Sequence, residues 1–261
     1  MTRAAFPRSP LTLVLGPLTF FSFSCGTLPP LRGKIDVGKE AFAVFVGGSG
    51  VSGDLYAVRA DGGPAFPITY TPVAELAPAQ APNGTDLAFL RSQSLRDSTP
   101  ATVWVMNLLN GSERELELPK AAGAPRQVGW SEKGRVVIVR TGEGLYRVDA
   151  PPAKPEVSPV PPADSAVAES SLAVLLGDPV FARVVLCKRT TDLCLTTRRG
   201  APGILAQAAR DPVRWGTDSV AFLVGDNLLQ IRPLAKGRPR ALNWSNVPAR
   251  PRQLTFFEGG G

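Results

Sequence analysis

The sequence predicts an all-β protein, made of short strands that recur along the chain in similar groups. Gly and Pro contribute 26 residues each to a chain of 261. Turn-forming residues at this density favour short strands joined by turns over a helical bundle. Hydrophobic residues make up 44% of the chain, which is typical of a packed globular protein. The chain is long enough for one sizeable hydrophobic core or two small domains.

The N-terminal segment has the parts of a secretory signal peptide. Arg3 and Arg8 lie in a first stretch without acidic residues, an apolar run follows over residues 11–23, and small residues come next. This order is typical of a signal peptide, and the run is too short to span a bilayer, which takes about 20 residues. We therefore expect residues 1–24 to be removed. A buried hydrophobic helix is the alternative, although a Gly-Pro pair interrupts the run.

Cys25 directly follows this segment, in the sequence Ser22-Phe23-Ser24-Cys25, which resembles a bacterial lipobox. The resemblance implies that Cys25 becomes the lipidated first residue of the mature protein. Gly26 in place of Asp resembles the signal that directs such proteins to the outer membrane. Ordinary cleavage near the same point is the alternative, and it would give a soluble periplasmic or secreted protein. Residues 25–39 then form a short tether before the folded part of the chain.

The two remaining cysteines are close enough in the chain to be bonded across a hairpin. A turn at Thr190 and Thr191 places Cys187 opposite Cys194. Directly paired strand residues have Cβ atoms about 4.5–5.5 Å apart, which a disulfide can bridge. Disulfides persist outside the cytosol, in agreement with export. Two free buried thiols are the alternative, and the spacing does not match the C-x-x-C of a redox site.

One strand pattern recurs through the rest of the chain. Its copies are residues 54–58, 102–106, 144–148, 192–195 and 227–231. The copies are about 43 residues apart on average, which is the length of one four-stranded propeller blade. We therefore predict a β-propeller over residues 40–257, with about five blades, or six if the flanking segments contribute more. An open β-sandwich is the main alternative.

The two ends of the repeat region are complementary. The first unit, residues 40–72, lacks a leading strand, and the segment Arg250–Phe257 lies beyond the fifth unit. We predict that this segment returns to complete the first blade and closes the ring. Radial stacking of blades buries both faces of each sheet and leaves short protected edges. The fourth unit, residues 165–208, is recognisable only by its expected strands.

The second repeat carries the most specific motif. Residues 78–89 read PAQAPNGTDLAF and residues 102–111 read TVWVMNLLNG. Together they resemble the repeat unit of TolB-type, WD-repeat-like propellers, P-x-W-S-P-D-G-x-x-I-A-F followed by I-Y-V-M-D. Trp130 and Trp215 begin looser matches to the same unit. The resemblance covers residues 40–257. It implies a non-enzymatic, monomeric propeller of the cell envelope that binds or scaffolds other envelope proteins.

The sequence contains no familiar catalytic or metal-binding pattern. The chain has no His, which removes the commonest general base and the commonest metal ligand. Gly47–Gly50 matches neither a nucleophile elbow nor a phosphate-binding loop, and we interpret it as a hairpin loop. We expect no catalytic residue, no metal and no cofactor. The residues that bind the partner are not indicated.

Charged and aromatic residues have simple structural interpretations. The net charge of +7 is carried by basic residues scattered along the chain, a pattern typical of a solvated surface, so we expect no nucleic acid as a partner. Glu113, Glu115 and Glu117 alternate along one expected strand face, and we interpret that face as solvated. Aromatic residues recur at equivalent repeat positions and are expected in the core between blades: Tyr56, Trp104, Trp130, Tyr146 and Trp215.

A second function is compatible with the same fold. The central channel of the propeller could bind carbohydrate, or could catalyse a lyase or hydrolase reaction without His. Acidic side chains converging at one end of the channel would favour this function. A lining of small and apolar side chains would favour a binding module instead.

Overall fold

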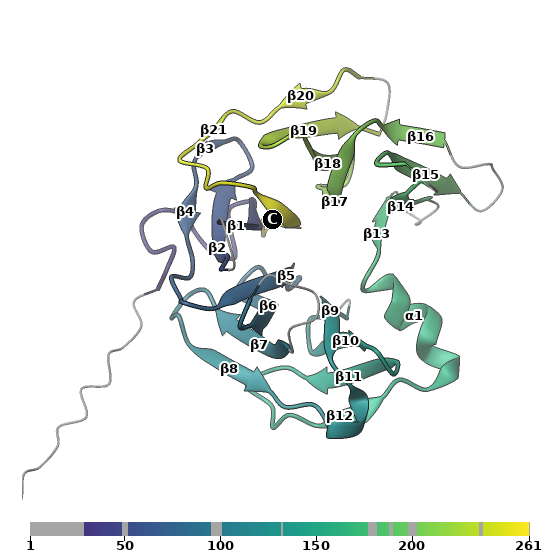
Figure 1. Ribbon diagram of the computed structural model, residues 1–261. Helices are drawn as coiled ribbons and strands as arrows, with labels where there is room; N and C mark the ends of the chain where they lie inside the picture. Colours follow the sequence, from purple (N-terminus) through teal and green to yellow (C-terminus); the bar gives the residue numbers. More distant parts are fainter. Residues whose placement is uncertain are drawn as a thin grey trace, which may run out of the picture.

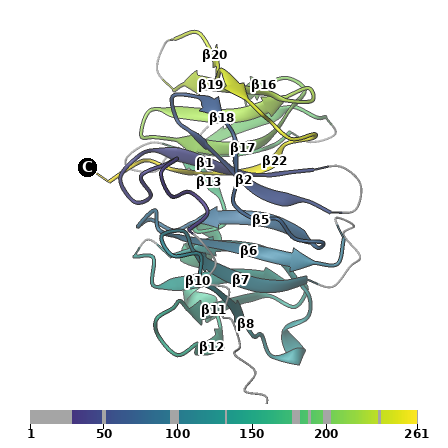
Figure 2. The same cartoon turned by 90° about the vertical axis from the view of Figure 1, so that its left-hand side faces the viewer.

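The structure is a ring of five four-stranded antiparallel sheets, viewed along the ring axis in Figure 1. It is a computed structural model, which describes residues 29–48, 52–94, 101–131, 133–176, 182–187, 190–197, 203–234 and 237–260. In side view the strands run along the axis and neighbouring blades stack against each other (Figure 2). The prediction of an all-β propeller is confirmed, and the number of blades is five.

The first blade is completed by the end of the chain, as predicted. From the axis outward its strands are β22 (Arg252–Phe257), β1 (Phe42–Gly47), β2 (Asp54–Arg59) and β4 (Phe66–Pro67). β22 pairs antiparallel with β1, with Phe257 opposite Phe42. The Phe257 ring also covers Gly84 of the second blade, where a Cβ atom would lie 2.3 Å from the ring. Strands from both ends of the propeller therefore close the ring.

Blades 2 and 3 have the same order of strands from the axis outward. Blade 2 contains β5 (Ala74–Gln80), β6 (Asp86–Ser92), β7 (Ala101–Asn107) and β8 (Glu113–Leu116). A 3-10 helix, η1 (Lys120–Ala122), leads to blade 3, which contains β9 (Pro125–Trp130), β10 (Val136–Thr141), β11 (Leu145–Asp149) and β12 (Val157–Pro159). The second strands, β6 and β10, are mostly buried, because each blade is packed between two neighbours.

Blades 4 and 5 complete the ring. Blade 4 contains β13 (Val174–Leu176), β14 (Ala182–Leu186), β15 (Leu193–Thr197) and β16 (Gly203–Ala206). Blade 5 contains β17 (Ala209–Trp215), β18 (Ser219–Val224), β19 (Leu228–Pro233) and β20 (Arg240–Ala241). After blade 5, β21 (Trp244–Ser245) pairs in parallel with β3 (Gly63–Pro64). This small ladder ties the last blade to the first before the chain enters β22.

The hydrophobic core lies between the blades. β1 shows how it is built: Phe42, Val44 and Val46 pack toward blade 2, whereas Ala43 and Phe45 pack toward blade 5. This alternation follows from the two-residue period of a strand. Similar buried clusters join blade 2 to blade 3 and blade 4 to blade 5. Four of the five contacts between neighbouring blades are therefore apolar cores.

The contact between blades 3 and 4 is built differently. Within the described residues, no buried apolar cluster joins these two blades. The 3-10 helix η2 (Pro162–Asp164) and the helix α1 (Ser165–Ser170) lie between them instead (Figure 1). The fourth unit, residues 165–208, therefore begins with the helix α1 before its strands. Among the residues described, no helix has the length and apolar character needed to cross a membrane.

Polar contacts hold this connection, residues 162–173, against blade 3; we call it the seam segment. The side-chain amide of Gln127 donates a hydrogen bond of 2.8 Å to the carbonyl of Leu172. Gly129 lies so close to the seam segment that a Cβ atom there would be 2.2 Å from the carbonyl oxygen of Ser171. Arg140 forms an ion pair with Glu169 of α1. The seam segment thus takes the place that an apolar core occupies elsewhere in the ring.

Candidate functional site

The central channel is a large cavity of the molecule, with a volume of about 850 Å³. Its wall is formed by the innermost strands of the five blades together with the end of the seam segment. The lining side chains are mostly small, apolar or amide groups, joined by arginines: Ala77, Pro78, Ala79, Gln80, Arg126, Gln127, Val174, Asp211, Pro212, Arg214, Gln253, Leu254 and Thr255. Asp211 is the single carboxylate in the described lining.

Three of the innermost strands carry the same backbone irregularity. Ala77 in β5, Asp211 in β17 and Gln253 in β22 have φ values of 48°, 51° and 54°. In all three blades the pairing with the second strand shifts register at this level, as in a β-bulge. None of these residues is glycine, so the left-handed conformation is strained and is held by the surrounding structure. The bulges bend the channel wall at one common level.

Side chains of β22 hold the neighbouring strand β5 in the wall. The backbone N–H of Ala77 donates to Oε1 of Gln253 over 2.8 Å. The backbone N–H of Gln80 donates to Oγ1 of Thr255 over 3.0 Å. Both contacts advance in the same direction along the two strands, so the innermost strands run parallel to each other. Their first residues therefore lie together at one end of the channel, which we call the mouth.

Arginines gather at the mouth. Arg210 donates to the carboxylate of Asp211 and to the carbonyl of Pro251, both over 2.7 Å. It also donates to the carbonyls of Gly225 and Asp226, both over 3.2 Å. This guanidinium therefore connects β17, the β18–β19 turn and the segment that leads into β22. Four protein acceptors satisfy it, so we assign Arg210 a structural role.

Arg252 is the least satisfied of these arginines. Its guanidinium is half-buried, and one nitrogen, Nη2, is buried without a hydrogen-bond partner among the described residues. Burial lowers the pKa of Arg252; the carboxylate of Asp211 opposes this, while the positive charges of Arg210 and Arg250 add to it. Arg126, exposed on β9, also lines the channel. The mouth therefore combines several positive charges with one carboxylate that Arg210 already binds.

A disulfide-bonded hairpin stands beside the mouth. The structure contains a bond between Cys187 and Cys194, with Cα atoms 5.1 Å apart. The predicted direct pairing of these two residues was wrong: Cys194 lies opposite Val185, and the N–H of Cys187 donates to the carbonyl of Asp192. The bond therefore crosses the hairpin diagonally.

This register is accompanied by contacts with the next blade. The carbonyl of Thr191 accepts a hydrogen bond from the N–H of Ala209, and the carboxylate of Asp192 accepts one of 2.9 Å from the N–H of Ala208. These contacts reach across to the start of β17 in the next blade. The disulfide thus stabilises a hairpin that fixes part of the mouth.

The predicted aromatic positions lie between blades. Trp130 and Trp215 are buried. The indole N–H of Trp130, in blade 3, donates to the carbonyl of Ala79 in blade 2 over 2.8 Å, and Trp215 stacks on Phe256 with ring centroids 4.2 Å apart. Tyr56 and Trp104 are partly buried against the same kind of cluster. These four side chains therefore serve the inter-blade core, as expected, and Tyr146 is half-buried on β11.

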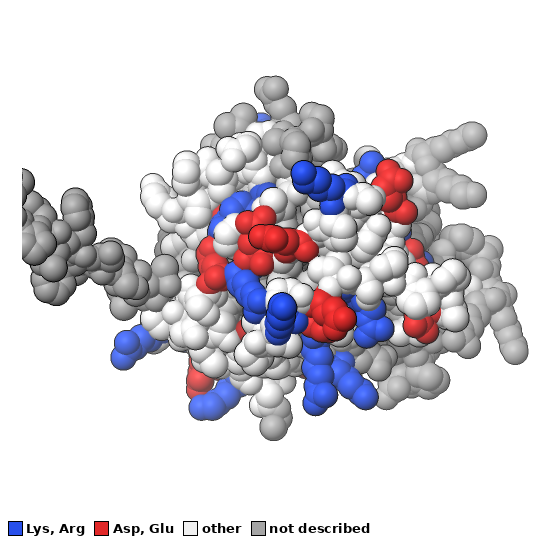
Figure 3. Space-filling view, turned by 90° about the horizontal axis from the view of Figure 1, so that it is seen from below, with Lys and Arg blue, Asp and Glu red and all other residues white. Residues whose placement is uncertain are grey.

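Other predicted positions are solvated or lie outside the description. Glu115 and Glu117 are exposed, as expected. Glu113 is also exposed, but it binds Arg91 over 2.9 Å. On the side of the ring that bears β8 and β12, acidic and basic side chains are interspersed (Figure 3). Cys25, the residue predicted to be lipidated, lies outside the described residues.

One charged group of the structure, Glu75, was not indicated by any sequence pattern. It has no exposed surface and accepts hydrogen bonds from the hydroxyl of Thr71 over 2.8 Å and from Nε of Arg91 over 3.2 Å. Burial raises the pKa of Glu75, which Thr71 and Arg91 partly oppose. Arg91 lies between Glu75 and Glu113 and over the ring of Trp104. This network is a structural junction inside blade 2.

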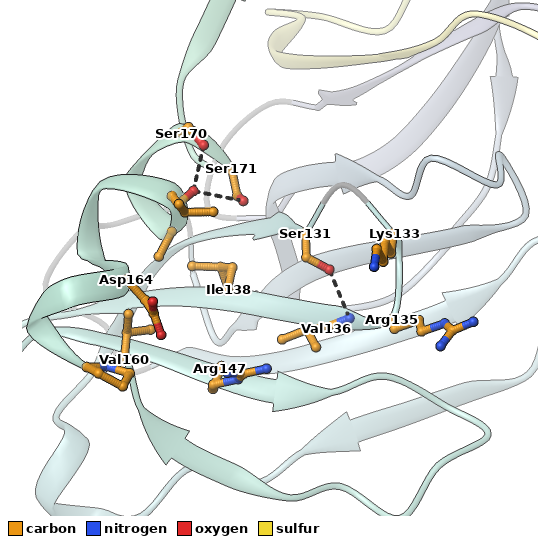
Figure 4. Close-up of a pocket in the computed structure, with 13 residues that line it drawn as sticks. Ser131, Lys133, Arg135, Val136, Ile138, Arg147, Val160, Asp164, Ser170 and Ser171 are labelled. Atoms are coloured by element: carbon orange, nitrogen blue, oxygen red, sulfur yellow. Dashed lines mark hydrogen bonds between the residues drawn. The ribbon is translucent and has the colours of Figure 1, made fainter.

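A second cavity, of about 400 Å³, lies between blade 3 and the seam segment (Figure 4). It is lined by residues from the β9–β10 turn, β10, β11 and α1. Ser131 binds the N–H of Val136, and Ser170 and Ser171 bind the carbonyl of Val167. These hydroxyls are therefore engaged by backbone groups close to them in the chain.

Solved structures similar to this chain include TolB proteins. TolB from Acinetobacter baumannii is 13% identical, with a TM-score of 0.57, and the match covers 83% of this chain and 66% of that one. The putative TolB from Agrobacterium tumefaciens is 13% identical, with a TM-score of 0.34 and coverages of 84% and 71%. The tricorn protease is 16% identical, with a TM-score of 0.44 and coverages of 83% and 24%.

The Acinetobacter structure supports the resemblance to a TolB-type propeller at the level of the fold. The present chain spans just under two thirds of that protein and about a quarter of the tricorn protease. No family model matches the chain, and no curated protein matches it.

Proposed function

We propose that this TolB-like propeller is a non-enzymatic protein-binding module of the bacterial cell envelope, and that its partner docks at the mouth of the central channel. The observation that carries the proposal is the chemistry of the mouth. Arg126 is exposed there, Arg252 is partly exposed, and the single lining carboxylate, Asp211, is bound by Arg210. Such a surface has positive charge available for an acidic segment of another protein.

The rigidity of the mouth supports the same proposal. The disulfide hairpin is bound to the start of β17, and Arg210 connects β17 to two further segments, the β18–β19 turn and the segment before β22. Binding to a preformed surface loses less conformational entropy than binding to a mobile one. The small, apolar and amide lining of the channel is the lining expected of a binding module. A channel that binds carbohydrate, or that catalyses a lyase or hydrolase reaction without His, would instead be expected to have several acidic side chains converging at one end.

The proposal also includes the location of the protein in the cell. The disulfide between Cys187 and Cys194 is typical of an oxidising compartment. We propose residues 1–24 as the signal peptide, residues 25–39 as the tether and residues 40–257 as the propeller, with a lipid on Cys25. Leu31, Ile35 and Val37 are buried against blades 1 and 2, so the later part of the tether is packed on the propeller. Metabolic labelling with a fatty-acid analogue tests the anchor: the native protein should take up label and Cys25→Ser should not. Equal labelling of both proteins would contradict the anchor and leave the channel proposal standing.

Site-specific photo-crosslinking in cells tests the docking site. A photoreactive amino acid replaces Arg126 at the mouth or, as the control, Arg240 on the outer strand β20, where the side chain is also exposed. An envelope protein crosslinked from position 126 and not from position 240 supports the proposal. The purified partner should then bind Arg126→Glu at least about tenfold more weakly than the native protein, a loss of about 1.4 kcal/mol. Equal crosslinking from both positions would contradict the docking site.

A further inference from the structure

The cavity between blade 3 and the seam segment has the composition of a binding site separate from the channel. Its volume of about 400 Å³ falls within the range of about 300–1,000 Å³ that is usual for ligand pockets. Its floor is apolar and comes from two sides: Val136 and Ile138 from β10, and Val160, Val167 and Ala168 from the seam side. Val167 is 68% exposed at the edge of this floor and is one of several large apolar side chains that the fold leaves exposed.

Positive charges border the cavity on one side. Lys133 and Arg135 extend from the β9–β10 turn, and Arg147 lies on β11 beneath Val136 (Figure 4). None of these three side chains has an ion-pair partner among the described residues. Asp164, on η2, also lines the cavity. The cavity therefore combines three cations, an apolar floor and one carboxylate.

Some basic side chains of the described residues are held by ion pairs and others are not. Arg91, Arg140 and Arg210 each bind a carboxylate. Three cations grouped beside one cavity without such partners repel each other, so they contribute nothing to the stability of the fold through ion pairing. An anionic group placed among them would meet complementary charge, and an aliphatic group attached to it would reach the apolar floor.

We propose that this cavity binds an acidic peptide segment that carries an aliphatic side chain, supplied by a protein partner. The carboxylates pair with Lys133 and Arg147, the aliphatic side chain covers Val136, Ile138 and Val167, and Arg135 adds charge at the outer end. The open side of the cavity leaves room for the peptide backbone to continue. This inference rests on the proposed protein-binding function and assigns it a second contact surface, away from the channel mouth.

A synthetic peptide tests the site directly. The probe is a capped hexapeptide of alternating Glu and Leu, with a photoreactive leucine analogue at one position and a fluorophore for anisotropy titration. It should bind the full chain in low salt, bind more weakly in 0.5 M salt, where the screening length falls to roughly 4 Å, and crosslink to residues within 131–171. A Glu-Ser hexapeptide and citrate are the competing probes, and both should bind more weakly because neither covers the apolar floor.

Matched variants test which side chains contribute to the affinity for the probe. The double variant Lys133→Glu, Arg147→Glu should weaken the Glu-Leu probe at least about tenfold. The control Arg238→Glu, Arg240→Glu makes the same charge change on exposed residues near β20 and should bind the probe as the native protein does. Val167→Ala should weaken the Glu-Leu probe and leave citrate unaffected. All these positions are solvent-accessible in the structure, and circular dichroism verifies that the variants fold.

Several outcomes would overturn the inference. Absence of binding at millimolar probe, or an equal loss in the control variant, would show that the cavity has no specific affinity for acidic peptides. Citrate bound as tightly as the peptide would show a small-anion site. If binding of the peptide probe is lost on substitution of Arg126 and not of Arg147, the probe has bound at the channel mouth. That result would support the proposed function and would overturn the inference of a second binding surface.

Discussion

A single buried carboxylate has the clearest energetic signature at the residue scale. Glu75 has no exposed surface, and burial raises its pKa above the ordinary value of a glutamate. The folded state therefore prefers the protonated form more than the unfolded chain does. The stability that this group contributes is fully present below its unfolded pKa, about 4.3. It is lost as the pH rises through the folded pKa.

Glu75→Gln should remove this pH dependence. The amide keeps an acceptor oxygen for Thr71 and Arg91 but does not titrate. The free energy of unfolding of the native protein, measured relative to that of the variant by urea titration, should fall between pH 4 and pH 8. Glu115→Gln, on the exposed face of β8, is the control and should show no such trend. A difference that grows with pH would mean that Arg91 stabilises the charged form more than burial opposes it.

Residue-scale features of the channel were hidden in the sequence. Ala77, Asp211 and Gln253 adopt left-handed backbone conformations, yet none is a glycine, and nothing in their neighbours signals a bulge. The buried position of Glu75 was hidden for a similar reason, because an acidic residue in a strand usually indicates a solvated side. The cysteine pair was recognisable by its spacing, whereas its register depended on contacts with Ala208 and Ala209 in another blade.

At the scale of elements, the seam segment is held by close backbone contact rather than by a buried core. Gly129 on β9 allows the carbonyl of Ser171 to approach the strand. The strands of the ring could be predicted because one strand pattern recurs about every 43 residues and turn-forming residues separate the strands. α1 could not, because its six residues, SAVAES, are too few to show a helical period. The position of such a short segment is determined by its contacts with neighbouring strands, so its own sequence shows no periodicity that would predict it.

Gly129→Ala should therefore loosen the seam segment. The added Cβ would lie 2.2 Å from the Ser171 carbonyl oxygen, and an overpacked contact of this kind costs about 1–3 kcal/mol. Hydrogen exchange should show faster exchange in residues 162–173, together with a lower melting temperature. Gly203→Ala in β16 is the matched control, since its Cβ would meet nothing within 4 Å. Equal effects of the two substitutions would indicate a general cost of alanine in strands instead.

The ion pair across the seam should respond to acid. Hydrogen bonding from Arg140 lowers the pKa of Glu169, so the pair stabilises the docked helix above the unfolded pKa, and this contribution is lost as the pH falls through the folded pKa. Both side chains are more than a third exposed, so the effect is about 0–1 kcal/mol. Limited proteolysis within residues 162–173 should accelerate at acid pH in the native protein. In Glu169→Gln, cleavage should already be faster at neutral pH and should change less with acid.

At the scale of the whole molecule, the ring depends on one late strand. β22 supplies the innermost strand of blade 1, packs on blade 2 through Phe257 and on blade 5 through Phe256. Three blades therefore meet at the end of the chain. The sequence predicted this closure, because the first repeat lacked a strand and a matching strand remained after the fifth.

Deletion of residues 249–261 should sharply lower the melting temperature. The truncated chain loses the partner of β1 and exposes apolar surface that Phe256 and Phe257 cover; truncation of one such ring alone typically costs about 3–5 kcal/mol. A synthetic peptide of residues 249–261, added in excess, should restore much of the melting temperature by pairing with β1. An unchanged melt in the truncated protein would contradict the role of β22 in closing the ring.

Because β22 closes the ring, the first blade can be completed only late in synthesis of the chain. A ribosome adds roughly 5–20 residues each second, and roughly 200 residues separate β1 from β22, so β1 waits on the order of ten seconds or more for its partner. During that interval its sequence, FAVFVG, presents an unpaired apolar edge of the kind that pairs with other chains. The nascent chain therefore keeps this edge of β1 unpaired until β22 has been made.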